Sequence, residues 1–460
     1  MIAATVLGSG VVFLDGTVVN VALPAVSADL GASVRGLQWM LDGYLVTLSA
    51  LLLLGGSAGD RHGRRQVFVA GLVGFSAASV LCGLAPGLGF LIVARALQGV
   101  AGALLVPASL SIISSGFDAD DRGRAIGAWS GLAAIAGAAG PLVGGWLVDA
   151  ASWRLIFFIN VPVAAAAVAI AVRHVPESRD EDAGRLDLTG AALVSAGIAL
   201  VAYGLIERSA VAGLAGAAAL AAFVIVEARS DHPMLPLTLF RSWQFTGANL
   251  TTVAVYGAMG AAWFLIVLRL QVTLGYSALE AGSSLLPFTI LMVTLSARIG
   301  ALAQRIGARG PMTVGPLGSA AGLLLFADIG PGDHYGRAVL PAVLLFGIGM
   351  TVTVAPLTAA VLGAVERRRA GVASAVNNVA ARLAGLLGIA LIPAVAGIDT
   401  GAGVARSLDT GYPTALRISA AACATGAAIA WFFVRDSARV RPVTHPAQSH
   451  ACADACVEAA

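Results

Sequence analysis

The sequence predicts an all-α membrane protein, a bundle of fourteen transmembrane helices. Its 460 residues are 58% hydrophobic and only 12% charged, whereas a soluble domain has roughly 25% charged residues. Apolar stretches of about twenty residues recur along the whole chain, and a helix needs that length to cross a bilayer. The chain is therefore expected to cross the membrane many times.

Clusters of Arg, Asp, Gly and Pro separate the fourteen apolar windows from one another. The windows cover residues 3–24, 37–57, 67–84, 89–113, 125–148, 155–172, 188–206, 209–228, 244–268, 279–299, 311–329, 338–363, 370–396 and 412–434. An even number places both termini on one side, and that side holds nineteen Arg residues against seven on the other. By the positive-inside rule, we expect both termini in the cytoplasm and the protein in the cytoplasmic (inner) membrane.

The basic residues and short motifs argue against several enzyme classes. All 28 basic residues are Arg, so neither a P-loop lysine nor a Schiff-base lysine is possible. One GxSxG pattern, at Gly55–Gly59, ends an apolar run and follows no predicted strand. The tail contains Cys452 and Cys456, with His445 and His450 nearby, and we expect no metal site there. We expect no enzyme activity, no cofactor and no nucleic-acid partner.

Two halves of the chain resemble each other. Gly59–Arg65 reads GDRHGRR and Ala303–Arg309 reads AQRIGAR, at a spacing of 244 residues. Six spans, two inserted spans and six further spans are the simplest organisation. The predicted parts are an N-terminal bundle (1–172), a cytoplasmic linker (173–187), an inserted helix pair (188–229), a C-terminal bundle (230–434) and a disordered cytoplasmic tail (435–460). Repeated halves are typical of alternating-access carriers, whose substrate site lies at the interface of the halves.

The loop after the second span carries the most specific motif, Gly56-Ser-Ala-Gly-Asp60-Arg61-His-Gly63-Arg64-Arg65. Gly63 permits a tight turn, Asp60 can pair or cap at a helix end, and the arginines favour the anionic inner leaflet. This loop resembles the cytoplasmic signature of the major facilitator superfamily, and more narrowly its fourteen-helix drug:proton antiporter branch. The resemblance covers nearly the whole chain. The second copy has Gln304 in place of Asp60, so a charge relay is not implied there.

The first and fourth spans contain the candidate proton-coupling residues. The first reads Leu14-Asp15-Gly-Thr17-Val-Val-Asn20 and is similar to the first-helix motif of that branch. The fourth contains Arg95 and Gln98 in a stretch that resembles the family's fourth-helix motif. A rise of 1.5 Å per residue puts Asp15 ~13 Å and Arg95 ~9 Å below the outer ends of their helices, which is compatible with a pair. The resemblance implies proton coupling at this pair and substrate contacts at Gln98 and Asn20, whereas a purely structural ion pair stays an alternative.

Further polar and small residues are candidates for the pathway or for conformational change. Asp42 is either a second proton or cation site or a solvated group at the vestibule. The fifth span has a motif similar to that of the superfamily's antiporters, which implies a segment that bends and seals as the halves move. Its residues are Gly140, Pro141, Gly144 and Gly145. In the second half the candidate pathway residues are Trp263, Phe264, Asn377, Asn378 and Arg382, while Glu280 is expected at the membrane interface.

The resemblance implies a monomeric proton-coupled antiporter that exports amphipathic drugs or antibiotics, with protons and the bilayer as its other partners. A dedicated exporter of one self-made antibiotic or metabolite would use the same helices. Two alternatives belong to other functional classes: a membrane sensor that transports no substrate, and a membrane-embedded enzyme. The sensor predicts that Asp15 and Arg95 can be neutralised together with no change in substrate movement.

Overall fold

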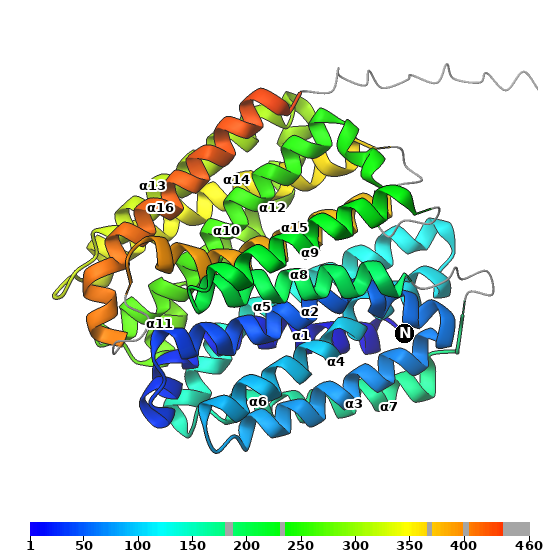
Figure 1. The fold of residues 1–460 in the computed structure, drawn as a ribbon, viewed down its shortest axis with the longest axis horizontal. Helices are drawn as coiled ribbons and strands as arrows, with labels where there is room; N and C mark the ends of the chain where they lie inside the picture. Colours follow the sequence, from blue (N-terminus) through cyan, green and yellow to red (C-terminus); the bar gives the residue numbers. More distant parts are fainter. Residues whose placement is uncertain (180–186, 231–234, 366–369, 399–403, 436–460) are drawn as a thin grey trace, which may run out of the picture.

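The computed structural model of the protein describes residues 1–179, 187–230, 235–365, 370–398 and 404–435. Within these ranges the regular structure is entirely helical, and long helices run side by side along the bundle (Figure 1). The predicted all-α fold is therefore confirmed. Residues 180–186 of the predicted linker and nearly all of the predicted tail, with its Cys and His residues, lie outside the described residues.

The first half of the bundle contains six membrane-crossing segments. Their helices are α1 (Ile2–Leu30), α2 (Val34–His62), α3 (Arg64–Gly83), α4 (Leu88–Gly116), α5 (Ala119–Ala150), α6 (Leu155–Phe158) and α7 (Asn160–His174). α6 and α7 together form one span. The first predicted window ends at Pro24, but α1 continues to Leu30 and ends where Gly31 adopts a left-handed conformation with φ 63°. Membrane helices tolerate an internal proline because neighbouring groups satisfy the freed backbone.

The second half contains another six crossing segments. Its helices are η1 (Leu237–Arg241), α10 (Trp243–Val272), α11 (Ala278–Ser284), α12 (Leu286–Ile306), α13 (Arg309–Ala327), η2 (Tyr335–Val339), α14 (Leu340–Gly363), α15 (Ala370–Val395) and α16 (Val404–Phe433). α11 joins α12, and η2 joins α14, to make two of these spans.

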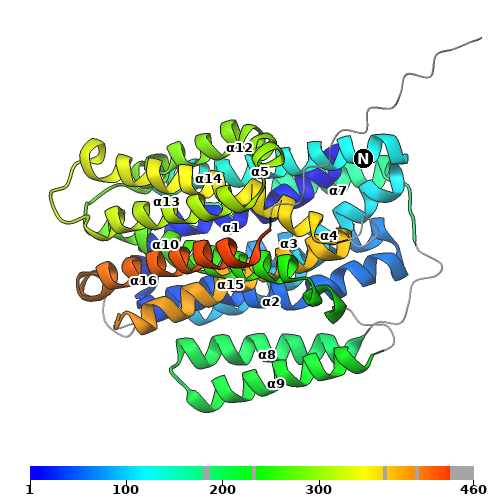
Figure 2. The same cartoon turned by 90° about the horizontal axis from the view of Figure 1, so that it is seen from above.

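Between the halves, α8 (Leu188–Ile206) and α9 (Ala210–Arg229) form a helix pair at the side of the bundle (Figure 2). Ile198 and Ala202 on α8 pack with Val46 of α2 and Leu386 of α15, so the pair contacts both halves. Val211 of α9 is 80% exposed, as expected for a side chain that faces lipid.

Thirteen of the described helical segments are long and apolar enough to cross a membrane. The count becomes fourteen when the two parts of α2, which bend by 55° between Val34–Leu52 and Leu54–His62, are taken as one span. This agrees with the predicted fourteen spans in a six-plus-two-plus-six order. The exact domain boundaries stay a prediction.

Candidate functional site

A buried ion pair joins α1 and α4 in the first half. Arg95 Nη1 lies 2.6 Å from Asp15 Oδ2, and the two side chains are 1% and 0% exposed. The pairing expected from the depth of the two residues is therefore present. An ion pair so fully removed from water is stable only when further hydrogen bonds satisfy its remaining donors and acceptors.

Those hydrogen bonds come from three helices. Gln98 Nε2 on α4 donates to Asp15 Oδ1 at 2.9 Å, and Gln98 Oε1 accepts from Arg95 Nη1 at 2.6 Å. Asn160 Nδ2, at the start of α7, donates to the same Asp15 oxygen at 3.1 Å. Ser79 Oγ on α3 accepts from both amides, at 2.8 Å and 3.2 Å. The Asp15 carboxylate thus accepts three hydrogen bonds, and we call these five residues the Asp15 network.

The guanidinium of Arg95 is also held by α2. Its Nε donates to the carbonyl oxygen of Met40 at 3.4 Å, and its Cζ lies 4.2 Å from the centre of the Tyr44 ring. The Phe157 ring centre lies 5.7 Å away. The negative face of an aromatic ring stabilises a cation, especially away from water. Arg95 therefore has several partners besides Asp15.

Asp42 is equally buried but has different surroundings. Its side chain is 0% exposed, and neither carboxyl oxygen has a hydrogen-bond partner among the described residues. It lies two residues before Tyr44 on α2, the helix that also borders the second half. Gln38, one turn before Asp42, donates from Nε2 to the Ile389 carbonyl oxygen of α15 at 2.7 Å. Asp42 thus belongs to a helix at the boundary between the halves, as a pathway residue would.

Three of the second-half candidates, Arg382, Trp263 and Phe264, occupy different kinds of position. Arg382 on α15 is half-buried and close enough to Tyr44 of α2 for an electrostatic interaction. Trp263 joins an aromatic cluster, with ring centres 5.0 Å from Phe288 and 6.3 Å from Phe346. Phe264 is fully buried in the packed core, so its expected place along the pathway has no support in the packing.

The polar candidates on α1 and α15 mostly bond within the protein. Asn377 Nδ2 donates to Thr252 Oγ1 at 2.7 Å and to Asn249 Oδ1 at 3.2 Å. Asn378 is exposed and donates to a carbonyl of its own helix. Asn20 likewise donates to the Gly16 carbonyl oxygen at 3.3 Å. Asn377 is therefore a packing residue of the second half in this conformation.

The signature loop between α2 and α3 forms the expected turn and pair. Gly63 has φ 110°, a conformation that side chains rarely adopt, and Arg64 Nη2 lies 2.8 Å from Asp60 Oδ1. Glu177, which the sequence reading missed, accepts from the backbone N–H of Arg65 at 3.0 Å. Arg65 also pairs with Glu177 through its side chain at 3.6 Å. The two remaining motif residues are Arg61, which is exposed, and Gly56, which lies against Pro107 of α4.

The glycines of the fifth-span motif allow α5 to approach two other helices. Gly140 and Gly144 lie against Thr17 and Val18 of α1, and a Cβ at Gly144 would lie 2.5 Å from Val18 Cγ2. A Cβ at Gly145 would lie 2.5 Å from Leu279 Cα of α11. The close approach expected from small residues is therefore present, on α1 and across the halves.

Two further contacts join α5 to α11. Pro141 packs against Gly282, where the backbones leave no room for a side chain. Asp149, near the end of α5, accepts from the backbone N–H groups of Ala278 at 3.0 Å and Leu279 at 2.8 Å. These contacts hold the two halves together at the end of the bundle opposite the Gly63 loop.

The sequence did not single out several of these residues, namely Ser79, Asn160, Asp149 and Glu177. A uniform survey of uncharged polar residues inside apolar windows would have found Asn160 and Ser79. It would not have distinguished them from other polar residues, because the rotation of each helix about its axis decides which polar side chains come into contact.

Comparisons with known proteins bear on the family and the fold. The family model described as Major Facilitator Superfamily matches residues 5–389. The chain is 34% identical to the tetracenomycin C resistance and export protein of Streptomyces glaucescens, over 85% of this chain and 74% of that protein. It is 34% identical to the puromycin resistance protein pur8 of Streptomyces alboniger, over 92% and 88%. It is also 34% identical to the multidrug resistance protein Stp of Mycobacterium tuberculosis, over 85% and 74%.

Among solved structures, the partially occluded inward-open xylose transporter XylE of E. coli superposes with a TM-score of 0.65. The alignment covers 95% of this chain and 99% of that one at 15% identity, so it bears on the fold alone. The family match over most of the chain, the 34% identity to several relatives and the shared fold lead to one conclusion: this multi-pass membrane protein belongs to the major facilitator superfamily.

Proposed function

We propose that the protein is a proton-coupled antiporter that exports amphipathic drugs or antibiotics across the cytoplasmic membrane by alternating access. The observation that carries this proposal is the Asp15 network, a fully buried carboxylate held by Arg95, Gln98 and Asn160. A charged group inside a membrane is costly, so such a group is a functional candidate by default. Export is supported by the relatives, whose names describe multidrug resistance, antibiotic resistance and antibiotic export.

In the proposed cycle, a proton reaches Asp15 when the bundle is open to the outside. Neutral Asp15 no longer attracts Arg95 as a counter-ion, so the hold of α1 on α4 weakens. Opening to the cytoplasm then releases the proton and lets a new substrate bind. The protein works in this scheme as a monomer with both termini in the cytoplasm.

The contacts between halves support alternation. Gln271 Nε2 on α10 donates to the Val21 carbonyl oxygen of α1 at 2.9 Å, next to the α5–α11 contact with its Asp149 bonds. These bonds close one end of the bundle and would have to break when that end opens. A ligand or proton shifts such an equilibrium only by its different affinity for the two states, so in this scheme substrate and proton must each bind one state more tightly.

The test is ethidium efflux from energised cells that express the wild type or Asp15→Asn, with and without a protonophore. We expect both the substitution and the protonophore to abolish efflux. Efflux that survives in the Asn variant would remove Asp15 from the proton path and make Asp42 the next candidate. Asp121, whose side chain is 63% exposed, supplies a matched control, because Asp121→Asn removes an acid that lies outside the network.

A second candidate is a dedicated exporter of one antibiotic or metabolite. It is favoured by relatives whose printed names refer to a single compound, tetracenomycin C or puromycin. A panel of structurally unrelated antibiotics separates the two functions. Protection against several classes supports multidrug export, and protection against one class supports the dedicated exporter.

A further inference from the structure

The loop between α8 and α9 bonds the inserted helix pair to both halves of the bundle. Glu207 and Arg208 are consecutive residues of this loop, and their side chains bond to different halves. Glu207 bonds to α2 of the first half, and Arg208 bonds to the backbone that follows α15 of the second half. The loop lies at the end of α2 opposite Gly63, which is also the end at which Asp149 joins α5 to α11.

The inserted pair has several polar bonds to the first half. Trp39 Nε1 on α2 donates to Glu207 Oε1 at 2.8 Å, and Arg35 Nη1 donates to Glu207 Oε2 at 3.3 Å. Farther along α8, Ser195 Oγ donates to the Ala50 carbonyl oxygen of α2 at 3.3 Å. The pair is therefore held to α2 at two levels along that helix.

At this end of the pair, the bond to the second half comes from Arg208. Its Nη2 donates to the carbonyl oxygen of Ile398 at 3.1 Å, and Ile398 is fully buried. The acceptor is a backbone group three residues beyond the end of α15. A movement of α15 away from α2 at this end would therefore break the bond.

The backbone of Arg208 is unusual. Arg208 is the one non-glycine residue with a positive φ, 54°, among the described residues. Crowding of the Cβ atom makes this left-handed conformation costly for residues that have one, and glycine avoids the cost. The same turn would form more easily with glycine at this position. What arginine adds is a side chain that reaches the Ile398 carbonyl oxygen of the other half.

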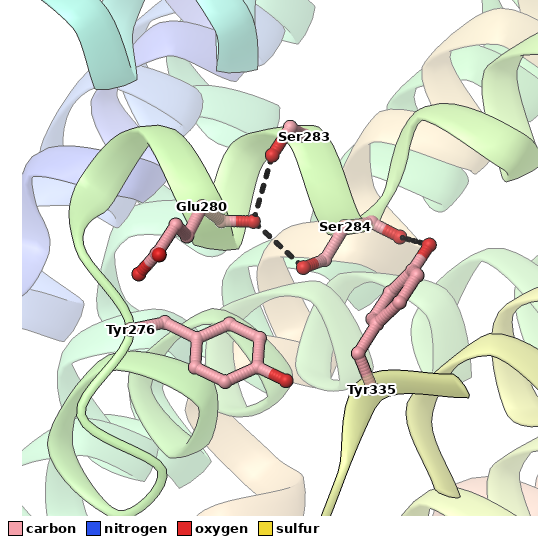
Figure 3. Close-up of a pocket in the computed structure, with 5 residues that line it drawn as sticks. All are labelled: Tyr276, Glu280, Ser283, Ser284 and Tyr335. Atoms are coloured by element: carbon pink, nitrogen blue, oxygen red, sulfur yellow. Dashed lines mark hydrogen bonds between the residues drawn. The ribbon is translucent and has the colours of Figure 1, made fainter. Parts of the chain in front are cut away.

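The second half is bonded internally at this end of the bundle. Figure 3 shows Ser283 and Ser284 of α11 with both hydroxyl groups directed at the Glu280 carbonyl oxygen. The Tyr335 hydroxyl, from the start of η2, donates to the Ser284 carbonyl oxygen at 3.2 Å. Because α11 is bonded to its own half, opening at this end has to break the bonds that cross between the halves.

We propose that the inserted helix pair moves with the first half and that Arg208 is a latch, which releases Ile398 when this end of the bundle opens. The Glu207 and Ser195 bonds keep the pair on α2, whereas the Arg208 bond crosses between the halves. Loss of the latch favours the state that is open at this end. This inference rests on the alternation between two states in the proposed function and is independent of proton coupling and of the substrate.

The experiment is double electron–electron resonance between spin labels on the purified full-length protein in detergent. The four native cysteines are first replaced by serine. Labels are then attached two at a time to Leu84→Cys in the first half, Val211→Cys in the inserted pair and His334→Cys in the second half. All three positions are exposed, and they lie at the end of the bundle where the latch is found. The distance between positions 84 and 334 reports opening.

We expect the distance between positions 84 and 211 to be the same in the closed and open states, while the distances of both from position 334 change together. Arg208→Gly is expected to raise the ratio of open to closed protein about threefold, the effect of one hydrogen bond between membrane helices. Arg208→Ala should give the same rise with lower thermal stability than Arg208→Gly, because alanine keeps the backbone cost. Arg417→Ala is the matched control and should leave the ratio unchanged, since Arg417 is a 59% exposed arginine that pairs within the second half.

Three results would overturn the proposal. An open population no larger in Arg208→Gly than in the wild type removes the latch, and an equal rise in Arg417→Ala removes its specificity. A distance between positions 84 and 211 that changes on opening means that the pair does not move with the first half. The populations are measured without transport. A protein that shows the expected shift but exports no ethidium would therefore contradict the export function and leave the latch in place.

Discussion

Asp15 and Asp42 are the same residue type at the same degree of burial, yet their surroundings are opposite. Both side chains are 0% exposed, on α1 and α2. Asp15 accepts hydrogen bonds from Arg95, Gln98 and Asn160, whereas both Asp42 oxygens lack a partner among the described residues.

In the proposed cycle, the partners of a buried carboxyl group, and not its burial alone, give its protonation an effect on the helices around it. Neutralising Asp15 leaves Arg95 as a buried cation without its counter-ion, which is costly enough to move helices. Neutralising Asp42 leaves no described group unpaired. Of the two carboxyl groups, we therefore expect protonation of Asp15 to have the larger effect on helix packing.

The largest effect is expected from Arg95→Leu, because it leaves the Asp15 carboxylate buried and unpaired. Breaking such a pair costs about 3 kcal/mol or more in soluble proteins. We expect lower thermal stability in detergent together with complete loss of proton-driven efflux. Thermal unfolding followed by tryptophan fluorescence and efflux from cells measure the two effects.

The double variant Asp15→Asn with Arg95→Gln is the control for this result. It removes both charges and keeps hydrogen-bonding groups, so we expect stability to return but exchange to remain absent. Exchange at the wild-type rate would contradict a role of the pair in coupling and would favour the non-transporting or purely structural interpretation.

The sequence predicted the Asp15–Arg95 pair because helix rise fixes the depth of each residue, and two opposite charges at compatible depths attract. It did not predict Asn160 or Ser79, because uncharged polar residues carry no linear mark of the neighbour they will meet. Trp263 and Phe264 illustrate the same limit. Adjacent residues on a helix point in different directions, and only packing showed that Phe264 faces the core.

A smaller effect is expected from Asn160→Ala. This substitution removes one hydrogen-bond donor from Asp15 and so makes its surroundings more like those of Asp42. Asn160 donates to Asp15 Oδ1 and to Ser79 Oγ. Hydrogen bonds between membrane helices are worth about 0.6 kcal/mol each, so two amount to about 1 kcal/mol, or about fivefold in an equilibrium constant. We expect efflux to persist with a pH profile displaced from that of the wild type. An unchanged profile would mean that Asn160 serves packing alone.

The smallest effect is expected from Asp42→Asn, which tests the other side of the comparison. Asn has nearly the same size, and the substitution breaks no hydrogen bond among the described residues. Removing a buried group that can carry charge and has no partner costs the fold nothing. We expect unchanged thermal stability and an efflux rate within about twofold of the wild type.

This last outcome decides how the two carboxyl groups share the transport cycle. If Asp42→Asn abolishes efflux while the protein remains folded, the unpartnered carboxyl carries the coupled proton. The Asp15 network would then be a structural clamp within the first half. If efflux persists, the result agrees with the absence of partners around Asp42: its protonation would break no hydrogen bond or ion pair among the described residues. The effect of a proton on the conformation of this bundle would then depend on how many ion pairs and hydrogen bonds its binding breaks. The depth of the protonated carboxyl group in the membrane would matter less.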